Sequence, residues 1–291
     1  MQTPAAFEYD RATSVAEALD LLERHGPETR LIAGGHSLLP MMKLRLARPD
    51  RLVDINPISD LSYIRVDGQE LAIGALTRHA ELLSSETLLH QYPIFAEAER
   101  VIADPVVRNR GTIGGSLCQG DPAEDLSAVV CALGAQLVIT SSRGSRTVPA
   151  REFYLGPYET AVGPAEMLTE VRLPLRRGAG SAYEKVERRA GDWAIAAVGC
   201  FLTVEEGRIS DCGIGLAAVG APGFCAPEAE ASLRGQPATP ERLGVAAELA
   251  AANCRPQSDQ RGPEDYKRHL VGELTRRALW RAARLAGQGG E

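Results

Sequence analysis

Two short glycine-rich segments carry the residue types in this chain that are best suited to binding an anion. Residues 33–37 are Ala-Gly-Gly-His-Ser, and residues 112–116 are Thr-Ile-Gly-Gly-Ser. Glycine has no Cβ and tolerates positive φ, so consecutive backbone N–H groups in such a turn can converge on phosphate oxygens. A Gly-Gly pair by itself also marks an ordinary tight turn. Two such segments in one chain nevertheless predict a ligand with two phosphates gripped from both sides, for which a dinucleotide is the natural candidate.

Other chemistries find little support in the sequence. It contains no Walker A motif, no G-x-S-x-G and no H-E-x-x-H, which disfavours a hydrolase or a phosphotransferase. Residues 213–220 superficially resemble a dinucleotide fingerprint, but their spacing is not G-x-G-x-x-G, and Pro222 follows where a helix should continue. We interpret them as a strand with small side chains. The six cysteines show no C-x-x-C spacing, so we expect neither a zinc site nor an iron–sulfur cluster on this chain. Cys131 and Cys200 lie inside apolar segments and are expected to be inert buried thiols.

Length and composition fit an ordinary globular protein of about two domains. The chain has 291 residues, of which 44% are hydrophobic and 24% charged, and its formal net charge is −6. This balance argues against nucleic-acid binding, and we interpret four late arginines as the solvated face of a C-terminal helix: Arg276, Arg277, Arg281 and Arg284. The N-terminus lacks the basic and apolar regions of a signal peptide, and no run approaches the ~20 apolar residues of a membrane span. We therefore expect a cytoplasmic protein with no metal site of its own.

The first 177 residues are expected to form one domain in two parts. Ser14 to Glu17 is a capping box that begins a helix, and Gly26 ends that helix. Strands at 31–33 and 52–55 complete a small βαβ-like subdomain over about residues 1–56. The larger α/β subdomain, residues 57–177, is expected to contain these elements: strand 71–74, a helix capped by Thr77, a helix opened by Pro93, helix 126–133, and strands 135–140 and 166–174.

A second domain is expected over residues 178–291, after a linker at about 176–181. Three successive strands are expected at 183–188, 193–205 and 209–219, in an antiparallel sheet. Thr239 provides an N-cap, with Pro240 at the first helical position, for a helix to about Asn253, and a long amphipathic helix follows. Because strands followed by helices are typical of an α+β domain, the sequence predicts an α+β fold overall.

These residues carry a resemblance to a known family. Residues 33–46, together with Thr-Ile-Gly-Gly at 112–115, resemble the FAD-binding medium subunit of carbon monoxide dehydrogenases. More broadly, the sequence is similar over essentially its whole length to the flavin subunits and domains of the molybdenum hydroxylase (xanthine dehydrogenase) family. The similarity includes these shorter motifs: Ile-Ala-Asp-Pro at 102–105, Asp-Pro-x-x-Asp at 121–125, Ala-Tyr-Glu-Lys at 182–185 and Ser-Asp-x-Arg-Gly-Pro at 258–263. The resemblance implies an FAD-binding domain over residues 1–177 and a C-terminal flavoprotein domain over 178–291.

The resemblance also implies where the FAD pyrophosphate is held. The first glycine segment should wrap it, with the amides of Gly34 and Gly35 and the hydroxyl of Ser37 as donors. His36 either donates to a phosphate or packs beside it. The second segment should grip the other side of the cofactor. The residues of the two segments that the resemblance assigns to FAD are Leu31, Ile32, Ala33, Gly34, Gly35, His36, Ser37, Leu38, Thr112, Ile113, Gly114, Gly115 and Ser116.

Five residues outside these segments are implied to contact FAD. Ile102 should pack against its apolar surface. Asp125 matches an acidic contact, and the same residue could cap the helix that begins at Leu126, alone or in addition to that contact. Leu168 matches an apolar neighbour of the flavin or belongs to the core. Lys185 matches a lysine close to the flavin, where a cation would stabilise the anionic reduced form; the alternative is a solvated lysine on an edge strand. Trp193 stands where relatives often have a tyrosine beside the flavin.

The resemblance implies an electron-transfer subunit rather than a complete enzyme, so we assign no catalytic residue to this chain. In the family, a large subunit oxidises the substrate at a molybdenum cofactor. Electrons then pass through two [2Fe–2S] clusters of a small subunit to FAD on the medium subunit and on to an external acceptor. The three subunits are expected as a dimer of heterotrimers, and the missing cysteine ligands agree with clusters on a partner chain.

Two other classes of function stay open from the sequence. A self-sufficient FAD oxidase or dehydrogenase would need a general base near the flavin, but His79, His90 and His269 all lie on expected helices and are expected at the surface. A non-catalytic assembly module with a vestigial nucleotide site is disfavoured because both glycine segments, Asp125 and Lys185 occur together. The oxidised substrate and the electron acceptor are not indicated by the sequence.

Overall fold

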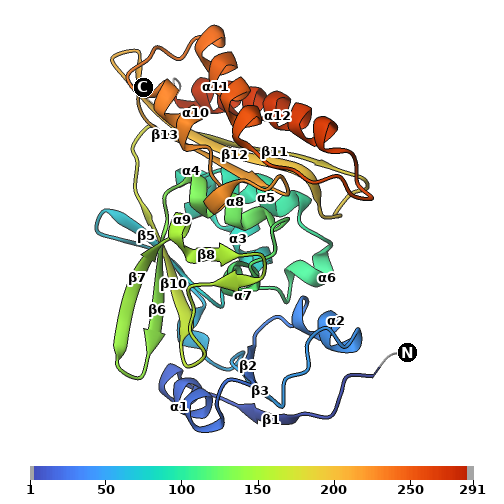
Figure 1. The fold of residues 1–291 in the computed structure, drawn as a ribbon. Helices are drawn as coiled ribbons and strands as arrows, with labels where there is room; N and C mark the ends of the chain where they lie inside the picture. Colours follow the sequence, from blue (N-terminus) through green and yellow to red (C-terminus); the bar gives the residue numbers. More distant parts are fainter. Residues whose placement is uncertain (1–2, 287–291) are drawn as a thin grey trace.

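The computed structural model of this chain describes residues 3–286, so the last five residues of the expected C-terminal domain lie outside the described part. Figure 1 shows a small N-terminal sheet, a middle region of sheet and helices, and a C-terminal sheet covered by helices. This arrangement confirms the predicted α+β fold.

The N-terminal sheet is parallel and has the strand order β1 (Glu8–Arg11), β3 (Arg51–Asp54), β2 (Thr29–Ile32). Parallel strands need crossover connections, which α1 (Val15–His25) and α2 (Leu38–Lys43) provide. Ser14 caps α1 by accepting the N–H of Glu17 at 3.2 Å, as the sequence predicts. Strand β1 was not expected, because its four residues are almost all exposed and show no apolar alternation.

The middle sheet is antiparallel and contains five strands. Their order is β4 (Ile64–Asp67), β5 (Glu70–Gly74), β10 (Met167–Pro174), β6 (Gln136–Ser141), β7 (Gly144–Pro149), and β8 (Tyr154–Gly156) pairs with β9 (Glu159–Thr160) beside it. The helices of this region are α3 (His79–Ser84), α4 (Glu86–Gln91), α5 (Ile94–Val101), α6 (Pro105–Arg108), α7 (Ile113–Gln119), α8 (Asp125–Ala132) and α9 (Ala150–Phe153). The main core lies between this sheet and these helices.

The C-terminal sheet consists of β11 (Gly180–Glu187), β12 (Ala194–Glu205) and β13 (Arg208–Ala217), all antiparallel. Helices α10 (Pro227–Leu233), α11 (Pro240–Asn253) and α12 (Glu264–Ala286) form a layer on one side, while α5 and α8 of the middle region pack against the sheet as well (Figure 1). Residues 194–203 of β12 are therefore continuously buried. Thr239 caps α11 by accepting the N–H of Arg242, with Pro240 at the first position, as predicted.

The glycines of residues 213–220 have a structural role. Gly213 and Gly215 of β13 lie directly on the backbone of α8, and a Cβ at either position would collide with the carbonyl oxygen of Ala132 or of Ala128. This close approach confirms the interpretation of the segment as a strand with small side chains. Cys131 and Cys200 are fully buried, and burial raises the pKa of both thiols, as expected of inert cysteines.

Ion pairs join the C-terminal sheet and helices to the middle region. The guanidinium of Arg151 donates to both carboxylate oxygens of Glu230 at 2.9 and 2.7 Å, and Glu230 is almost fully buried. Arg281 of α12 donates to Glu97 of α5 at 2.5 Å and to Glu184 of β11 at 2.7 Å. The prediction of four solvated arginines on this helix is therefore wrong for Arg281, while the other three are exposed.

Two further features concern the helices. The predicted N-cap Thr77 is wrong: α3 begins after Arg78, and the buried hydroxyl of Thr77 instead donates to the carbonyl oxygen of Tyr63 at 3.0 Å. Among residues 3–286, no helix combines the length and the apolar character that crossing a membrane requires.

Candidate functional site

The fold brings the two glycine segments into direct contact. A Cβ on Gly34 would lie 2.5 Å from the carbonyl oxygen of Arg110 and 2.6 Å from the Cα of Gly111. Only glycine fits at position 34, because both obstacles are backbone atoms that cannot move aside cheaply. The loop after β2 therefore rests on the backbone that leads into α7.

The loop after β2 presents a row of free hydrogen-bond donors. Within the described part of the chain, the backbone N–H groups of residues 34–38 have no acceptor. Ser37 precedes α2, and its hydroxyl makes no capping bond, while Gly35 has φ +77°, which turns the row. His36 is exposed. Because unpaired backbone donors need a partner, this row suits an anion with several oxygens.

Two polar side chains that sequence reasoning missed hold this loop in place. The amide nitrogen of Asn56 donates to the carbonyl oxygen of Ala33 at 2.7 Å, and Arg78 donates to the Asn56 side-chain oxygen at 2.7 Å. Arg78 also donates to the carbonyl oxygen of Arg110, so it connects both segments. The only local signal was Asp54, which accepts the N–H of Asn56 at 2.9 Å in an Asp-x-Asn turn after β3.

The second glycine segment is the start of a helix, not a turn with free amides. Thr112 caps α7 and accepts the N–H of Gly115 at 3.1 Å. The N–H groups of Ile113, Gly114 and Ser116 donate to backbone carbonyls, those of Thr77, Ala75 and Thr112. The expectation that both segments offer amides to phosphate is therefore wrong for the second one. What this segment leaves open to a ligand is the exposed Gly115 and the hydroxyl of Ser116.

A buried pair lies beneath this junction. His79 Nδ1 is 2.9 and 3.0 Å from the two carboxylate oxygens of Glu99, and His79 Nε2 is 3.0 Å from Ser116 Oγ. Burial alone would lower the pKa of His79, but the facing Glu99 carboxylate outweighs it and raises that pKa. The prediction that His79 lies at the surface is wrong, since the residue is 3% exposed, whereas His90 and His269 are exposed as predicted.

Asp125 and Lys185 meet in a second buried cluster. Lys185 Nζ donates to Asp125 at 2.9 Å and to the carbonyl oxygen of Val101 at 3.1 Å, and the Tyr183 hydroxyl donates to Asp125 at 2.6 Å. Burial raises the pKa of Asp125, and the Lys185 charge opposes this rise. The Lys185 side chain is 2% exposed, so it is not a solvated lysine.

Glu124, rather than Asp125, is the helix cap. The Glu124 carboxylate accepts the N–H groups of Leu126 and Ser127 at 2.9 and 2.6 Å, which assigns the capping role to the preceding residue. The alternative reading of Asp125 as an N-cap is therefore wrong. The carboxylates of Glu124 and Asp125 also raise the pKa of His79, so the two buried clusters lie near each other.

The remaining expected contacts lie around this second cluster. Ile102 follows Val101 and is half-buried, and the turn at Gly191 packs on the backbone of Ala103, which brings Trp193 to the same region. Trp193 is 43% exposed. Leu168 is 5% exposed and belongs to the main core, on β10, which packs against α7. The structure thus brings Ile102 and the turn before Trp193 close to the cluster of Lys185 and Asp125, and it places Leu168 in the core.

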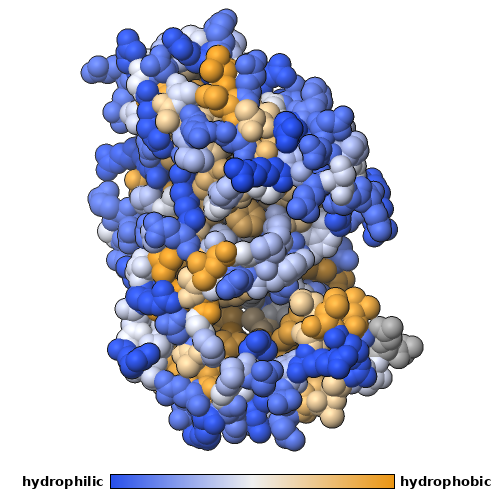
Figure 2. All heavy atoms as spheres, viewed as in Figure 1, coloured by the Kyte–Doolittle hydropathy of each residue, from blue (hydrophilic) through white to orange (hydrophobic). Residues whose placement is uncertain are grey.

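The surface over the site is hollowed and partly apolar. Figure 2 shows a recess between the N-terminal sheet and the middle region, and orange side chains gather beside it over α2. Leu39, Leu44 and Leu46, on and just after α2, are exposed. The amides of residues 34–38 can bind a diphosphate, and the exposed Gly115 leaves room beside them. Together with the partly apolar recess, they fit an extended ligand that has a diphosphate and an apolar ring.

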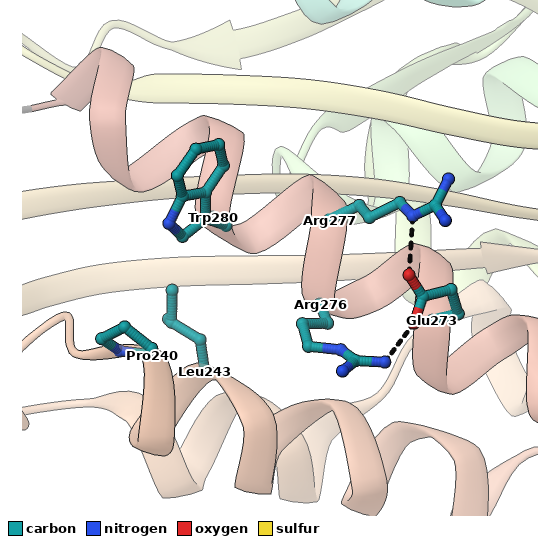
Figure 3. A pocket seen from close by; sticks show the side chains of 6 residues that line it. All are labelled: Pro240, Leu243, Glu273, Arg276, Arg277 and Trp280. Atoms are coloured by element: carbon teal, nitrogen blue, oxygen red, sulfur yellow. Dashed lines mark hydrogen bonds and ion pairs between the residues drawn. The ribbon is translucent and has the colours of Figure 1, made fainter.

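A separate groove of about 270 Å³ lies between α11 and α12 (Figure 3). Glu273 accepts hydrogen bonds from both Arg276 and Arg277 there, and Arg284 stacks over the ring of Trp280 at 4.7 Å. The arginines beside Glu273 are thus already paired, and this groove shares no residue with the glycine segments. Among the described residues, no group of three or more His, Cys, Asp or Glu side chains could hold a metal ion.

Comparisons with known proteins identify the family of this chain. Residues 5–176 match the family described as the FAD binding domain in molybdopterin dehydrogenase, and residues 181–282 match the CO dehydrogenase flavoprotein C-terminal domain. The chain is 43% identical to a carbon monoxide dehydrogenase medium chain from Afipia carboxidovorans, over 96% of this chain and 97% of that protein. It is 38% identical to a glyceraldehyde dehydrogenase medium chain from Sulfolobus acidocaldarius, over 95% and 98% of the two chains.

A solved structure shows the same fold. A carbon monoxide dehydrogenase from Hydrogenophaga pseudoflava superposes with a TM-score of 0.94 at 44% identity, covering 97% of this chain and 99% of that chain. The matched families, the relatives and the superposition together cover both parts of the molecule. This chain, an oxidoreductase flavoprotein with an FAD-binding domain, therefore belongs to the carbon monoxide dehydrogenase medium-subunit family of molybdenum hydroxylases.

Proposed function

We propose that this chain is the FAD-bearing electron-transfer subunit of a heteromeric molybdenum hydroxylase. A small partner subunit supplies electrons from two [2Fe–2S] clusters, and this chain passes them to an external acceptor. The large partner subunit carries the molybdenum cofactor, and the complex is a cytoplasmic dimer of heterotrimers. Residues 1–177 serve as the FAD-binding domain and residues 178–291 as the C-terminal flavoprotein domain. The observation that carries the proposal is the row of free amides at 34–38, packed against the start of α7.

The glycine segments would hold the pyrophosphate of FAD. The amides of residues 34–38 and the free hydroxyl of Ser37 supply donors, while Gly115 leaves room for close approach. Hydrogen bonds to a charged acceptor contribute about 1.5–3 kcal/mol each, so a few of them explain tight binding of a dianion. Asn56 and Arg78 keep the row in position before the ligand arrives.

The second cluster would hold the flavin end. FAD supplies the electron-accepting and electron-donating chemistry when bound. Asp125, which is itself held by the Tyr183 hydroxyl, and Glu187 fix the ammonium of Lys185 in one place, and a preorganised cation favours negative charge that develops beside it. Ile102 and Trp193 provide apolar surface in the same region. The chain itself therefore binds, orients and electrostatically supports the cofactor.

A self-sufficient oxidase or dehydrogenase is less well supported. Such an enzyme needs an accessible general base beside the flavin. Both ring nitrogens of His79 are engaged by Glu99 and Ser116, and the residue is buried. His90 and His269 are exposed on α4 and α12, away from the glycine segments in sequence and fold.

An absorption spectrum of the purified full chain tests the proposal. Flavin bands near ~370 and ~450 nm in the chain alone are expected, with iron–sulfur absorbance added only in material copurified with its native partners. A colourless chain in both preparations would refute the flavin assignment. Turnover of an organic substrate by the isolated chain would instead favour the self-sufficient enzyme.

A further inference from the structure

Ser116 is the one side-chain hydroxyl of the second glycine segment that faces a buried ionisable group. Its Oγ lies 3.0 Å from His79 Nε2, and the other ring nitrogen of His79 faces both carboxylate oxygens of Glu99. His79 is 3% exposed and Glu99 is fully buried. These three groups form a hydrogen-bonded chain from a buried carboxylate to Ser116, the residue that follows the exposed Gly115.

The direction of the hydrogen bonds follows from the chemistry of the groups. A carboxylate only accepts, so His79 Nδ1 carries a proton and donates it to Glu99. In the imidazolium form of His79, which the facing Glu99 carboxylate favours by raising the pKa of His79, Nε2 also carries a proton and donates it to Ser116 Oγ; in the neutral form with the proton on Nδ1 the same bond runs from Ser116 to Nε2. With His79 as the imidazolium, Ser116 accepts from His79 and has its own proton left over. No other group among residues 3–286 is hydrogen-bonded to that hydroxyl.

The same histidine also supports the contact between the two segments. A Cβ on Gly111 would lie 2.6 Å from His79 Cδ2, so the imidazole ring fills the space beneath Gly111. Gly34 in turn rests on Gly111. The buried ring of His79 therefore contacts Gly111, on which the first glycine segment rests, and it also contacts the Ser116 hydroxyl of the second segment.

We propose that His79 and Glu99 are positioning residues for the cofactor: they hold the Ser116 hydroxyl so that its proton is donated to the diphosphate of FAD. This inference rests on the proposed function, since it assumes that FAD binds at the glycine segments. It assigns a role to two residues outside both segments. It also gives a role to the buried histidine–carboxylate pair that lies behind the start of α7.

The test is a double-mutant cycle. The affinity of the FAD-free full chain for FAD is measured for each variant from the quenching of flavin fluorescence on binding. Ser116→Ala removes the donor. His79→Asn keeps a nitrogen where Nδ1 meets Glu99 but loses the contact with Ser116. Each change is expected to raise the Kd for FAD roughly 10- to 150-fold, the loss of one hydrogen bond to a charged acceptor. The double variant should bind no more weakly than Ser116→Ala alone, because both changes remove the same bond.

Two controls separate positioning from general loss of structure. Ser116→Thr keeps the hydroxyl and should retain the wild-type Kd, and His90→Asn changes an exposed histidine and should have no effect. The ³¹P spectrum of bound FAD should change in the same way in Ser116→Ala and His79→Asn. Should His79→Asn fail to fold, the comparison of Ser116→Ala with Ser116→Thr still decides the role of the hydroxyl.

The outcomes distinguish the two proposals. Wild-type chain that does not bind FAD would overturn both the proposed function and this inference. Wild-type chain that binds FAD, with Ser116→Ala within twofold of its Kd, would overturn the inference and leave the proposed function standing. Additive losses in the double variant would also overturn it, because the two residues would then act independently.

Discussion

Replacing Gly35 with alanine should weaken FAD binding by much more than it weakens the fold. Gly35 has φ +77°, a conformation in which a side chain costs about 1–2 kcal/mol. The added Cβ would lie 3.1 Å from the Cδ1 of Leu39, the end of a flexible side chain, so the backbone strain dominates. The loop relieves this strain by turning toward negative φ, and the amides at 34–38 then no longer converge.

The expected loss of FAD affinity follows from the number of backbone N–H donors that move away from the diphosphate. Each hydrogen bond to a charged acceptor contributes about 1.5–3 kcal/mol, so the loss of one raises the Kd for FAD roughly 10- to 150-fold. The Kd is measured by fluorescence titration of the FAD-free chain, and the free energy of unfolding by urea. We expect the free energy of unfolding to fall by no more than about 2 kcal/mol.

Gly207 provides a matched control. It has φ +74°, lies in the hairpin between β12 and β13, and a Cβ there would meet no atom within 4 Å. Gly207→Ala should therefore carry a similar backbone strain and leave the Kd for FAD unchanged. If Gly35→Ala binds FAD as tightly as Gly207→Ala does, the amides at 34–38 do not form the anion site and the reasoning fails.

Two further predictions concern the buried charges. Lys185→Met leaves Asp125 buried without its cation and should lower the free energy of unfolding, measured in urea, by about 3 kcal/mol. Lys43→Met changes an exposed lysine and should alter the free energy of unfolding by less than ~0.5 kcal/mol. Equal effects of the two substitutions would contradict the buried ion pair. Burial raises the pKa of Glu124 from 4.5 to about 7, so the folded chain binds this proton more tightly than the unfolded chain does. The resulting stability is present in full below pH 4.5 and is lost as the pH rises through 7, by about 3 kcal/mol in total. The variant Glu124→Gln should lack this part of the pH dependence in urea unfolding measured from pH 4 to pH 8, and an unchanged slope would exclude Glu124 as its source.

Local patterns in the sequence were enough for most of the fold. The N-caps at Ser14 and Thr239 and the three long C-terminal strands depend on neighbours a few residues apart, and the structure has all of them. The reciprocal bond of the predicted capping box is wrong, because the Glu17 carboxylate accepts the N–H of Thr13 instead of that of Ser14. Strand β1 was missed because a short polar strand becomes recognisable only through its pairing with β3, more than 40 residues away. Thr77 has the right residue type for a cap, but its hydroxyl is taken by Tyr63 across the fold.

In the candidate site, too, local patterns indicated some residues, while others are placed by contacts that are distant in sequence. The residue types of both glycine segments indicated an anion site, because glycine and hydroxyl residues show their use locally. Asn56, Arg78 and Glu99, which position the site, and the pairing of Lys185 with Asp125 were not recognisable, since each contact spans a long sequence separation. Arg78 reaches Asn56 and Arg110, Glu99 pairs with His79, and Lys185 meets Asp125 only after the chain has crossed from the middle region to β11.

The two glycine segments look alike in sequence but differ in physical role. In the first, the glycines free a row of amides that have no acceptor in the described chain. In the second, every amide from Ile113 to Ser116 already has a protein acceptor, so its glycines serve close packing and ligand access instead. A ligand held between them therefore receives backbone hydrogen bonds from one side and shape and a side-chain hydroxyl from the other. This asymmetry makes Gly35→Ala and Ser116→Ala independent probes: the first tests the donor row, and the second tests the hydroxyl that His79 orients.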